Sequence, residues 1–306
     1  PFFWQPRGSC IETAGFGAAM QAGAWVRGRV LWQALLIGKR EDMGRKALFF
    51  DVDGTLLSEV THTVPDSAVK ALSASRQAGN LVFINSGRTY SFLKDIENTV
   101  GCDGILCGCG TCVVERGKVV FQHRIDKEKG REIRKAMVGY GFDGILESTE
   151  GLYMRKQRSW IRPLNALRDE VARKGLLTDS RWEDENLEFD KFCVFADQGS
   201  DREGFFSFLS PDIQVIDRGD DFYECVPAGY TKATAIAWVL KHYGLEKKDA
   251  YVFGDSSNDL AMFAYADNAV LMHDHDKVLE PYATFVTKRV EEDGIAWAMQ
   301  ELGLTL

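Results

Sequence analysis

The chain has 306 residues, 45% of them apolar and 27% charged, a composition typical of folded proteins with room for two modest domains. Its formal net charge of −8 leaves no broad basic surface, so we expect no nucleic-acid partner. The apolar stretches fall short of the roughly 20 residues that a membrane-spanning helix needs, so we expect no membrane partner either. Seven cysteines, an odd number, in a chain without a clear secretory signal indicate a cytoplasmic location.

The first 42 residues differ in character from the rest. The chain begins with Pro1, and a short amphipathic stretch in this segment is interrupted by Arg27 and Arg29, which argues against a signal peptide. Residues 38–42 can be encoded by a purine-rich stretch that resembles a bacterial ribosome-binding site directly before Met43. We therefore expect residues 1–42 to be a doubtful leader outside the fold, with translation starting at Met43. A genuine N-terminal extension is the alternative.

From Met43, short apolar runs alternate with segments of helical spacing, which is typical of a parallel sheet covered by helices. In chain order the pattern predicts strand 47–50, helix 65–78, strands 81–84 and 104–107, a hairpin over 111–122, helix 233–243, strands 250–253 and 268–272, and helix 293–302. Three of these strands end abruptly in polar or acidic residues. Because parallel strands end along one edge of a sheet, Asp51, Ser86 and Asp255 should meet in one crevice.

About a hundred residues in the middle of the chain do not continue this rhythm. They predict helices 127–140, 161–174 and 201–209, and strands 144–148, 151–155, 191–196, 213–217 and 222–226. These elements suit a small α/β domain inserted into the first. The predicted fold is therefore α/β, with a Rossmann-like parallel-sheet core from residues 43–125 and 223–306 and an inserted α/β cap domain from residues 126–222.

The sharpest motif is Asp51-Val52-Asp53-Gly54-Thr55. Its two carboxylates are two residues apart where a buried strand ends, so both can face the crevice, and Gly54 permits a sharp turn and a close backbone approach. An ordinary Asp-Gly turn is the alternative. An EF-hand loop fits poorly, because the glycine is at the fourth position rather than the sixth.

Three further segments end or begin elements at the same edge. Ser86-Gly87-Arg88 offers a hydroxyl and backbone N–H groups to a phosphoryl oxygen, or is simply a loop. The stretch 254–259, Gly-Asp-Ser-Ser-Asn-Asp, offers oxygen ligands for an octahedral Mg²⁺ site, or is a helix N-cap. Lys232 places a cation near the start of a predicted helix, or is an ordinary surface lysine.

In order and spacing, these four segments resemble the haloacid dehalogenase-like superfamily, and the two-half insertion resembles its Cof-type (class IIB) phosphatases. The resemblance covers residues 45 to about 298, and the segment 292–296, Glu-Asp-Gly-Ile-Ala, matches as well. It implies a Mg²⁺-dependent phosphatase that hydrolyses a small phosphorylated metabolite, a sugar phosphate or a nucleotide-like compound, through an aspartyl-phosphate intermediate.

The resemblance also implies roles for single residues. Asp51 attacks phosphorus and Asp53 moves the proton, while Ser86 and Lys232 hold the phosphoryl oxygens. Mg²⁺ is implied to bind the Asp51 side chain, the Asp53 carbonyl and Asp255. The residues implied to position the phosphate or the site are Gly54, Thr55, Gly87, Arg88, Asn258 and Asp259. Cys109 stands where the family commonly has Asn, so the leaving-group contact expected from that Asn does not carry over.

Other groupings have simpler interpretations. Four cysteines lie close together in the sequence: Cys102, Cys107, Cys109 and Cys112. Zinc sites usually combine two such cysteine pairs, and the sequence offers no second one, so we interpret these cysteines as small buried residues. The run 273–276, His-Asp-His-Asp, reads as a solvated loop rather than a metal site. A cationic and aromatic patch on the insertion is a weak candidate for substrate selection, against an ordinary surface: Arg155, Arg158, Trp160 and Arg162.

Two rival functions remain open at this stage. A phosphomutase of the phosphomannomutase type shares the first motif and a related cap. A non-catalytic ligand sensor would usually lack the nucleophile or the acid, whereas Asp51 and Asp53 are both present. The patterns specify neither the physiological substrate nor an oligomeric state.

Overall fold

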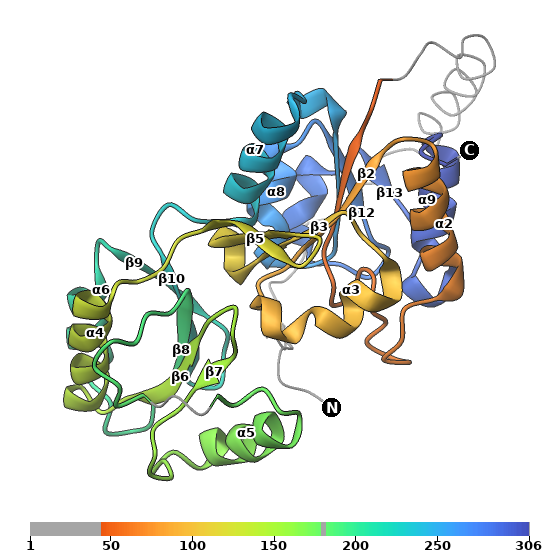
Figure 1. Ribbon diagram of the computed structural model, residues 1–306. Helices are drawn as coiled ribbons and strands as arrows, with labels where there is room; N and C mark the ends of the chain where they lie inside the picture. Colours follow the sequence, from red (N-terminus) through yellow and green to blue (C-terminus); the bar gives the residue numbers. More distant parts are fainter. Residues whose placement is uncertain (1–43, 179–181, 306) are drawn as a thin grey trace, which may run out of the picture. The chain divides into compact units, whose positions relative to one another are not determined.

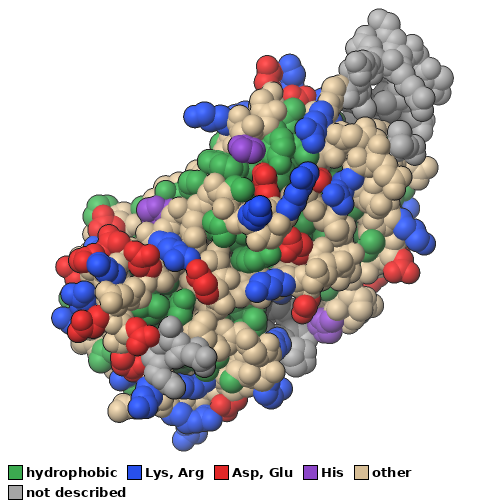
Figure 2. All heavy atoms as spheres, viewed as in Figure 1, with side chains coloured by type: hydrophobic (Ala, Val, Ile, Leu, Met, Phe, Trp, Pro, Cys, Tyr) green, Lys and Arg blue, Asp and Glu red, His purple; other side chains and the backbone are tan. Residues whose placement is uncertain are grey.

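The computed structural model describes residues 44–178 and 182–305, and from Arg45 onward the chain forms one compact unit (Figure 1). The predicted leader, residues 1–42, lies outside the described residues. Two sheets organise the described part, one of eight strands and one of five. None of the described helices combines the length and the apolarity needed to span a bilayer. On the face drawn in Figure 2, acidic and basic side chains are interspersed.

The large sheet is mostly parallel, as the sequence predicted. Its order is β13-β12-β11-β1-β2-β3-β4-β5, and only the pairs β3–β4 and β4–β5 are antiparallel. The strands are β1 (Ala47–Phe50), β2 (Leu81–Asn85), β3 (Gly104–Cys107), β4 (Cys112–Glu115), β5 (Lys118–Gln122), β11 (Ala250–Gly254), β12 (Asn268–Leu271) and β13 (Phe285–Val286). The central strands are buried on both faces, which explains why they are continuous apolar runs.

Helices cover both faces of this sheet (Figure 1). They are α2 (Asp66–Gln77), α3 (Lys94–Val100), α7 (Lys232–Tyr243), α8 (Leu260–Tyr265) and α9 (Gly294–Glu301). Leu48 and Phe50 pack in one core cluster with residues of α2 and α9, whereas Ala47 and Phe49 pack in another with residues of α7 and α8. Successive side chains of a strand point to opposite faces of the sheet, so alternate residues of β1 pack against the helices on either side.

The small sheet has the order β7-β6-β8-β10-β9. Its strands are β6 (Asp143–Glu147), β7 (Leu152–Tyr153), β8 (Lys191–Phe195), β9 (Ile213–Asp217) and β10 (Phe222–Pro227), and its helices are α4 (Lys127–Gly139), α5 (Arg162–Arg173) and α6 (Arg202–Leu209). Residues of α4 and α6 share a core cluster with Phe192 and Val194, while residues of α5 share a different cluster with Ile145 and Phe195. Because β10 belongs to this sheet, we propose that the inserted domain runs to about residue 227 rather than to 222.

The parallel pairing places the predicted site at one edge. Phe50 is in register with Ile84 of β2 and with Phe253 of β11. Asp51 directly follows β1, Ser86 follows β2 and Asp255 follows β11. The carboxyl ends of three adjacent strands therefore carry these residues to one edge of the large sheet, where open α/β sheets bind ligands.

Candidate active site

Asp51 and Lys232 form the centre of the site. Lys232 is the first residue of α7, whose start is fixed by reciprocal hydrogen bonds between Thr231 and Thr234. Its Nζ lies 2.6 Å from Asp51 Oδ1 and 2.6 Å from Asp259 Oδ1, and all three side chains are buried. The two carboxylates raise the pKa of Lys232 against the opposing effect of burial, so the ammonium stays charged.

Three carboxylates gather around this ammonium. One oxygen each of Asp51, Asp255 and Asp259 lies within 4.8 Å of the others. Burial, followed by repulsion from Asp259 and Asp51, raises the pKa of Asp255 well above its usual value, and burial raises that of Asp259 to about 6. Three carboxylates beside one ammonium leave an excess of two negative charges when all are ionised. An all-oxygen donor set with this excess fits a hard divalent cation.

The loop after β1 wraps closely around Asp255. Gly54 has a φ of +75°, and a Cβ atom there would lie 2.5 Å from Asp255 Oδ2, so only glycine fits both the conformation and the space. Thr55 Oγ1 donates a hydrogen bond of 2.9 Å to Asp255 Oδ1. Gly54 and Thr55, which the sequence predicts to be positioning residues, therefore lie against the carboxylate of Asp255.

Asp53 is paired with Arg88, a contact that the sequence did not predict. Arg88 Nε donates to Asp53 Oδ2 at 3.0 Å, and Arg88 Nη2 donates to Oδ1. Burial raises the pKa of Asp53, while the Arg88 charge works against this rise. Ser86 Oγ accepts a hydrogen bond of 3.2 Å from the Arg88 backbone N–H. The loop that follows β2 thus connects the predicted phosphate-binding serine to the predicted proton carrier.

The turn after β11 holds two more of the predicted positioning residues. Asp259 Oδ2 accepts the backbone N–H groups of Asp255 at 3.0 Å and Ser256 at 3.2 Å. Asn258 Oδ1 accepts from Ser256 Oγ at 3.0 Å and lies 3.4 Å from Lys232 Nζ. Both residues therefore orient the turn toward the ammonium, and Asp259 in addition joins the possible metal ligands.

Sequence reasoning missed four charged residues of the insertion that pair with one another: Glu147, Lys191, Arg218 and Glu224. Glu147, Lys191 and Glu224 are fully or almost fully buried. Thr89 Oγ1 lies 3.4 Å from Glu147 Oε2, and Cys109 Sγ lies 3.4 Å from Glu224 Oε1. A signal was present, since Glu224 lies inside β10, which is otherwise mostly apolar, and Lys191 begins the apolar strand β8.

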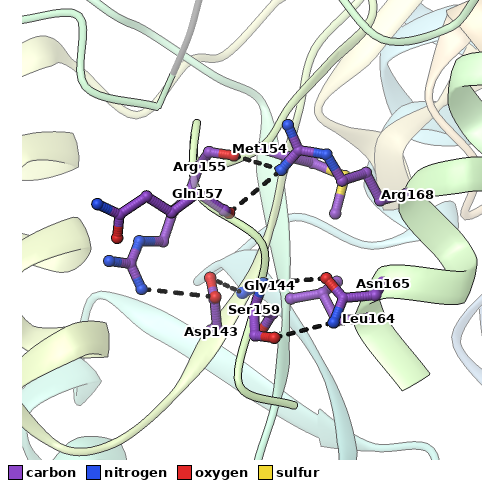
Figure 3. A pocket seen from close by; sticks show the side chains of 9 residues that line it. All are labelled: Asp143, Gly144, Met154, Arg155, Gln157, Ser159, Leu164, Asn165 and Arg168. Carbon is purple, nitrogen blue, oxygen red and sulfur yellow. Dashed lines mark hydrogen bonds and ion pairs between the residues drawn. The ribbon is translucent and has the colours of Figure 1, made fainter. Parts of the chain in front are cut away.

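In the patch predicted for substrate selection, Arg155 and Arg158 contact other residues of the insertion. Arg155 lies 3.5 Å from Asp143 and stacks over the ring of Trp160, and Arg158 pairs with Asp169. Arg162 begins α5. Arg155 also borders a small pocket with about 10 Å³ of space, enough for about one water molecule (Figure 3). Substrate selection by this patch stays a prediction.

The cysteine cluster and the run 273–276 lie in ordinary strand, turn and loop positions. Cys107 and Cys112 face each other across β3 and β4, and both are buried. Cys109 adopts a left-handed conformation with φ of +56° in the turn between these strands. In the run 273–276, His273 hydrogen-bonds Asp274 at 2.9 Å, and Asp276 accepts the Ser257 backbone N–H at 2.7 Å.

Comparison with known proteins assigns the chain to a family. Residues 48–299 match the family of haloacid dehalogenase-like hydrolases. The chain is 28% identical to the phosphatase candidate YkrA of Bacillus subtilis, over 86% of this chain and 99% of that protein. It is 25% identical to the 5-amino-6-(5-phospho-D-ribitylamino)uracil phosphatase YwtE of the same organism, over 84% and 98%.

Solved structures agree with the fold. A protein from Geobacillus kaustophilus matches with a TM-score of 0.74 and 26% identity, over 85% of this chain and all of that one. A sugar phosphatase of haloacid dehalogenase subclass IIB matches with a TM-score of 0.70 and 25% identity, over 85% and 99%. The chain belongs to the haloacid dehalogenase-like hydrolase family. The prediction of a Cof-type phosphoric monoester hydrolase is confirmed at this level.

Proposed function

We propose that the chain is a Mg²⁺-dependent phosphatase that hydrolyses a small phosphorylated metabolite through a phosphoryl group carried on Asp51. The observation that carries the proposal is the buried Lys232 ammonium, 2.6 Å from both Asp51 and Asp259 and beside the third carboxylate, Asp255. An Asp carboxylate next to a fixed cation is suited to in-line attack on a phosphoryl group, where alignment and charge neutralisation supply most of the catalysis.

The reaction has two displacements. Asp51 attacks phosphorus, forming one O–P bond as the bond to the leaving oxygen breaks, and Asp53 gives its proton to that oxygen. Burial raises the pKa of Asp53 in the direction that this step needs, and the Arg88 charge opposes that rise. Water then attacks phosphorus, returns a proton to Asp53 and releases phosphate and free Asp51. Ser86 and Lys232 hold the phosphoryl oxygens during both displacements.

The oxygens of Asp51 and Asp255, with the Asp53 carbonyl, would hold Mg²⁺, and Asp259 would support them. When bound, the ion neutralises and orients the phosphoryl oxygens. Mg²⁺ fits this role better than a softer metal, since the donors gathered here are carboxylates. Sugar-phosphate and ribityl-phosphate substrates are the classes that the named relatives suggest.

The test is hydrolysis of a generic aryl phosphate by purified protein, followed by release of inorganic phosphate. We expect turnover with Mg²⁺, none in excess chelator, and none from Asp51→Asn. A phosphomutase would instead move phosphate between positions of a sugar phosphate and release almost none to water. A protein that binds phosphorylated metabolites but turns over neither substrate would be a sensor, and would overturn the proposal.

A further inference from the structure

The turn 287–294, which we call the C-terminal turn, joins β13 to α9, and the proposed reaction gives its acidic residues no role. The Gly294 backbone N–H donates to the Arg289 carbonyl at 3.0 Å, and the Thr287 hydroxyl donates to the Gly294 carbonyl at 2.5 Å. A Cβ atom on Gly294 would lie 2.3 Å from a backbone oxygen of the same turn, so glycine is needed there. Asp293 adopts the left-handed conformation, with a φ of +57°. The acidic side chains of this turn therefore project from a tightly closed backbone.

Two of these acidic side chains hold the segment 58–67, which leads from the loop after β1 into α2. Glu291 Oε1 accepts a hydrogen bond from Ser58 Oγ, and Asp293 Oδ1 accepts one of 2.5 Å from Ser67 Oγ. Ser58 is almost fully buried, and its Oγ also accepts the backbone N–H groups two and three residues further along, at 3.0 and 2.9 Å. The Ser58 hydroxyl thus organises the backbone that follows it, and Glu291 fixes that hydroxyl to the C-terminal turn.

Ser58 directly follows the residue that closes the loop after β1. The Leu57 carbonyl accepts the Gly54 N–H at 3.0 Å, and Leu57 forms a β-bridge with Asp53. Gly54 lies against the Asp255 carboxylate, and the Asp53 carbonyl is a proposed Mg²⁺ ligand. A shift of Ser58 would therefore pass through Leu57 to two groups beside the proposed metal site.

We propose that Glu291 is a positioning residue that, through Ser58, fixes the loop after β1 in the geometry needed to bind Mg²⁺. This inference rests on the proposed phosphatase function and extends it to a residue outside the carboxylate cluster. Mg²⁺ needs near-ideal octahedral coordination at about 2.0–2.1 Å, so a small displacement of the Asp53 carbonyl weakens binding. Removing a residue that orients metal ligands typically costs about 10–100-fold in metal affinity or activity.

A purely structural tether would have a different signature. If the Glu291 contact served only to hold the chain together, its loss would lower the free energy of unfolding and leave Mg²⁺ affinity unchanged. The second hydrogen bond of the C-terminal turn provides the comparison, because Ser67 contacts the same turn but lies in the first turn of α2. Removing the Ser67 hydroxyl loosens the C-terminal turn without acting on the loop after β1.

The test compares Glu291→Ala with three variants of the same region. Glu291→Gln keeps an oxygen that accepts the Ser58 hydrogen bond, Glu292→Ala alters the neighbouring exposed acid, and Ser67→Ala removes the comparison contact. With an aryl phosphate, we expect Glu291→Ala to raise the Mg²⁺ concentration for half-maximal activity about tenfold and to lower kcat about tenfold, with KM changed less than about threefold. Glu291→Gln should recover most of this loss, and the other two variants should stay within about twofold of wild type.

Two readouts need no turnover. Calorimetric titration with Mg²⁺ alone should give a Kd about tenfold higher for Glu291→Ala than for wild type. In metal-free protein, the Gly54 amide should exchange its hydrogen faster in Glu291→Ala, because its hydrogen-bond partner is the Leu57 carbonyl. The exchange rate of the same amide should be unchanged in Ser67→Ala.

Three results would overturn the inference. One is an unchanged Mg²⁺ affinity in folded Glu291→Ala protein, and another is a Glu291→Gln variant as impaired as Glu291→Ala. The third is an equal loss in Glu292→Ala or Ser67→Ala, which would assign the effect to general loosening of the C-terminal turn. If the wild-type protein hydrolysed no aryl phosphate with Mg²⁺, the proposed function would fall and this inference with it. Normal turnover by wild type, with Mg²⁺ affinity retained in Glu291→Ala, would overturn this inference alone.

Discussion

Lys232→Met tests how the charged centre is held together. Methionine keeps most of the side-chain volume but removes the ammonium that contacts Asp51 and Asp259 at 2.6 Å. The carboxylates of Asp51, Asp255 and Asp259, two of them buried and that of Asp255 partly buried, then remain with oxygens within 4.8 Å of one another. Removing one partner of a buried ion pair costs about 3–5 kcal/mol, against a typical domain stability of about 5–15 kcal/mol. We therefore expect the free energy of unfolding to fall by about 3–5 kcal/mol at neutral pH in chelator.

Urea unfolding measures this loss, and three comparisons identify its cause. Asp259→Asn added to Lys232→Met should recover part of the loss, because one uncompensated charge is gone. Mg²⁺ should stabilise Lys232→Met more than wild type, because the cluster then carries a larger excess of negative charge. Acid should reduce the loss as well, because burial already raises the pKa of Asp259 to about 6 in the wild type, and losing the Lys232 charge raises it further, so Asp259 takes up a proton as the pH falls. A loss below about 1 kcal/mol that did not change with pH would refute the reasoning.

Other predictions address the nucleophile, the metal and the insertion. Asp51→Asn should lower kcat on the order of 10³-fold or more with the fold retained, and a tenth of wild-type turnover would contradict its role. Activity should vanish in chelator, return with Mg²⁺ and be inhibited by Ca²⁺, whose coordination is longer and looser; full activity in chelator would reject the metal. Gly54→Ala should raise the Mg²⁺ concentration needed for half-maximal activity, because its Cβ would displace the Asp255 carboxylate; an unchanged titration would argue against that position for the metal. Burial raises the pKa of Asp190 from 3.8 to about 7, so the folded state holds a proton that the unfolded state releases. Unfolding free energy should thus fall between about pH 4 and pH 7, by on the order of 4 kcal/mol. Asp190→Asn should flatten this slope in urea unfolding, and parallel pH curves for the two proteins would count against it.

The sequence predicted the elements of the large sheet well, because fully buried parallel strands are continuous apolar runs. Strands 47–50 and 104–107 agree with β1 and β3 at both ends. The helix α8 was missed, since it is only six residues long and almost entirely apolar, with no polar face to reveal a helical period.

The candidate site was predictable where short motifs end strands. Asp51 and Asp255 are placed by β1 and β11, and local spacing was sufficient to bring them together. The pairing of Arg88 with Asp53 joins two such loops, and no local pattern contains that information. The charged group of Glu147, Lys191, Arg218 and Glu224 was harder still to predict, because Glu147 and Glu224 are 77 positions apart in the printed sequence and no local pattern shows that their strands lie side by side. The sequence instead indicated the patch of Arg155, Arg158, Trp160 and Arg162 for substrate selection. In the structure, Arg155 pairs with Asp143 and Arg158 pairs with Asp169.

The central claim is a phosphoryl group carried by Asp51, and the stereochemical course at phosphorus tests it most directly. A phosphate ester made chiral at phosphorus with oxygen isotopes and sulfur would be hydrolysed by the protein in isotopically labelled water, and the configuration of the released thiophosphate determined. Each in-line displacement inverts phosphorus, so attack by Asp51 followed by attack by water predicts net retention. Net inversion would mean that water attacks the substrate directly, and would contradict the account.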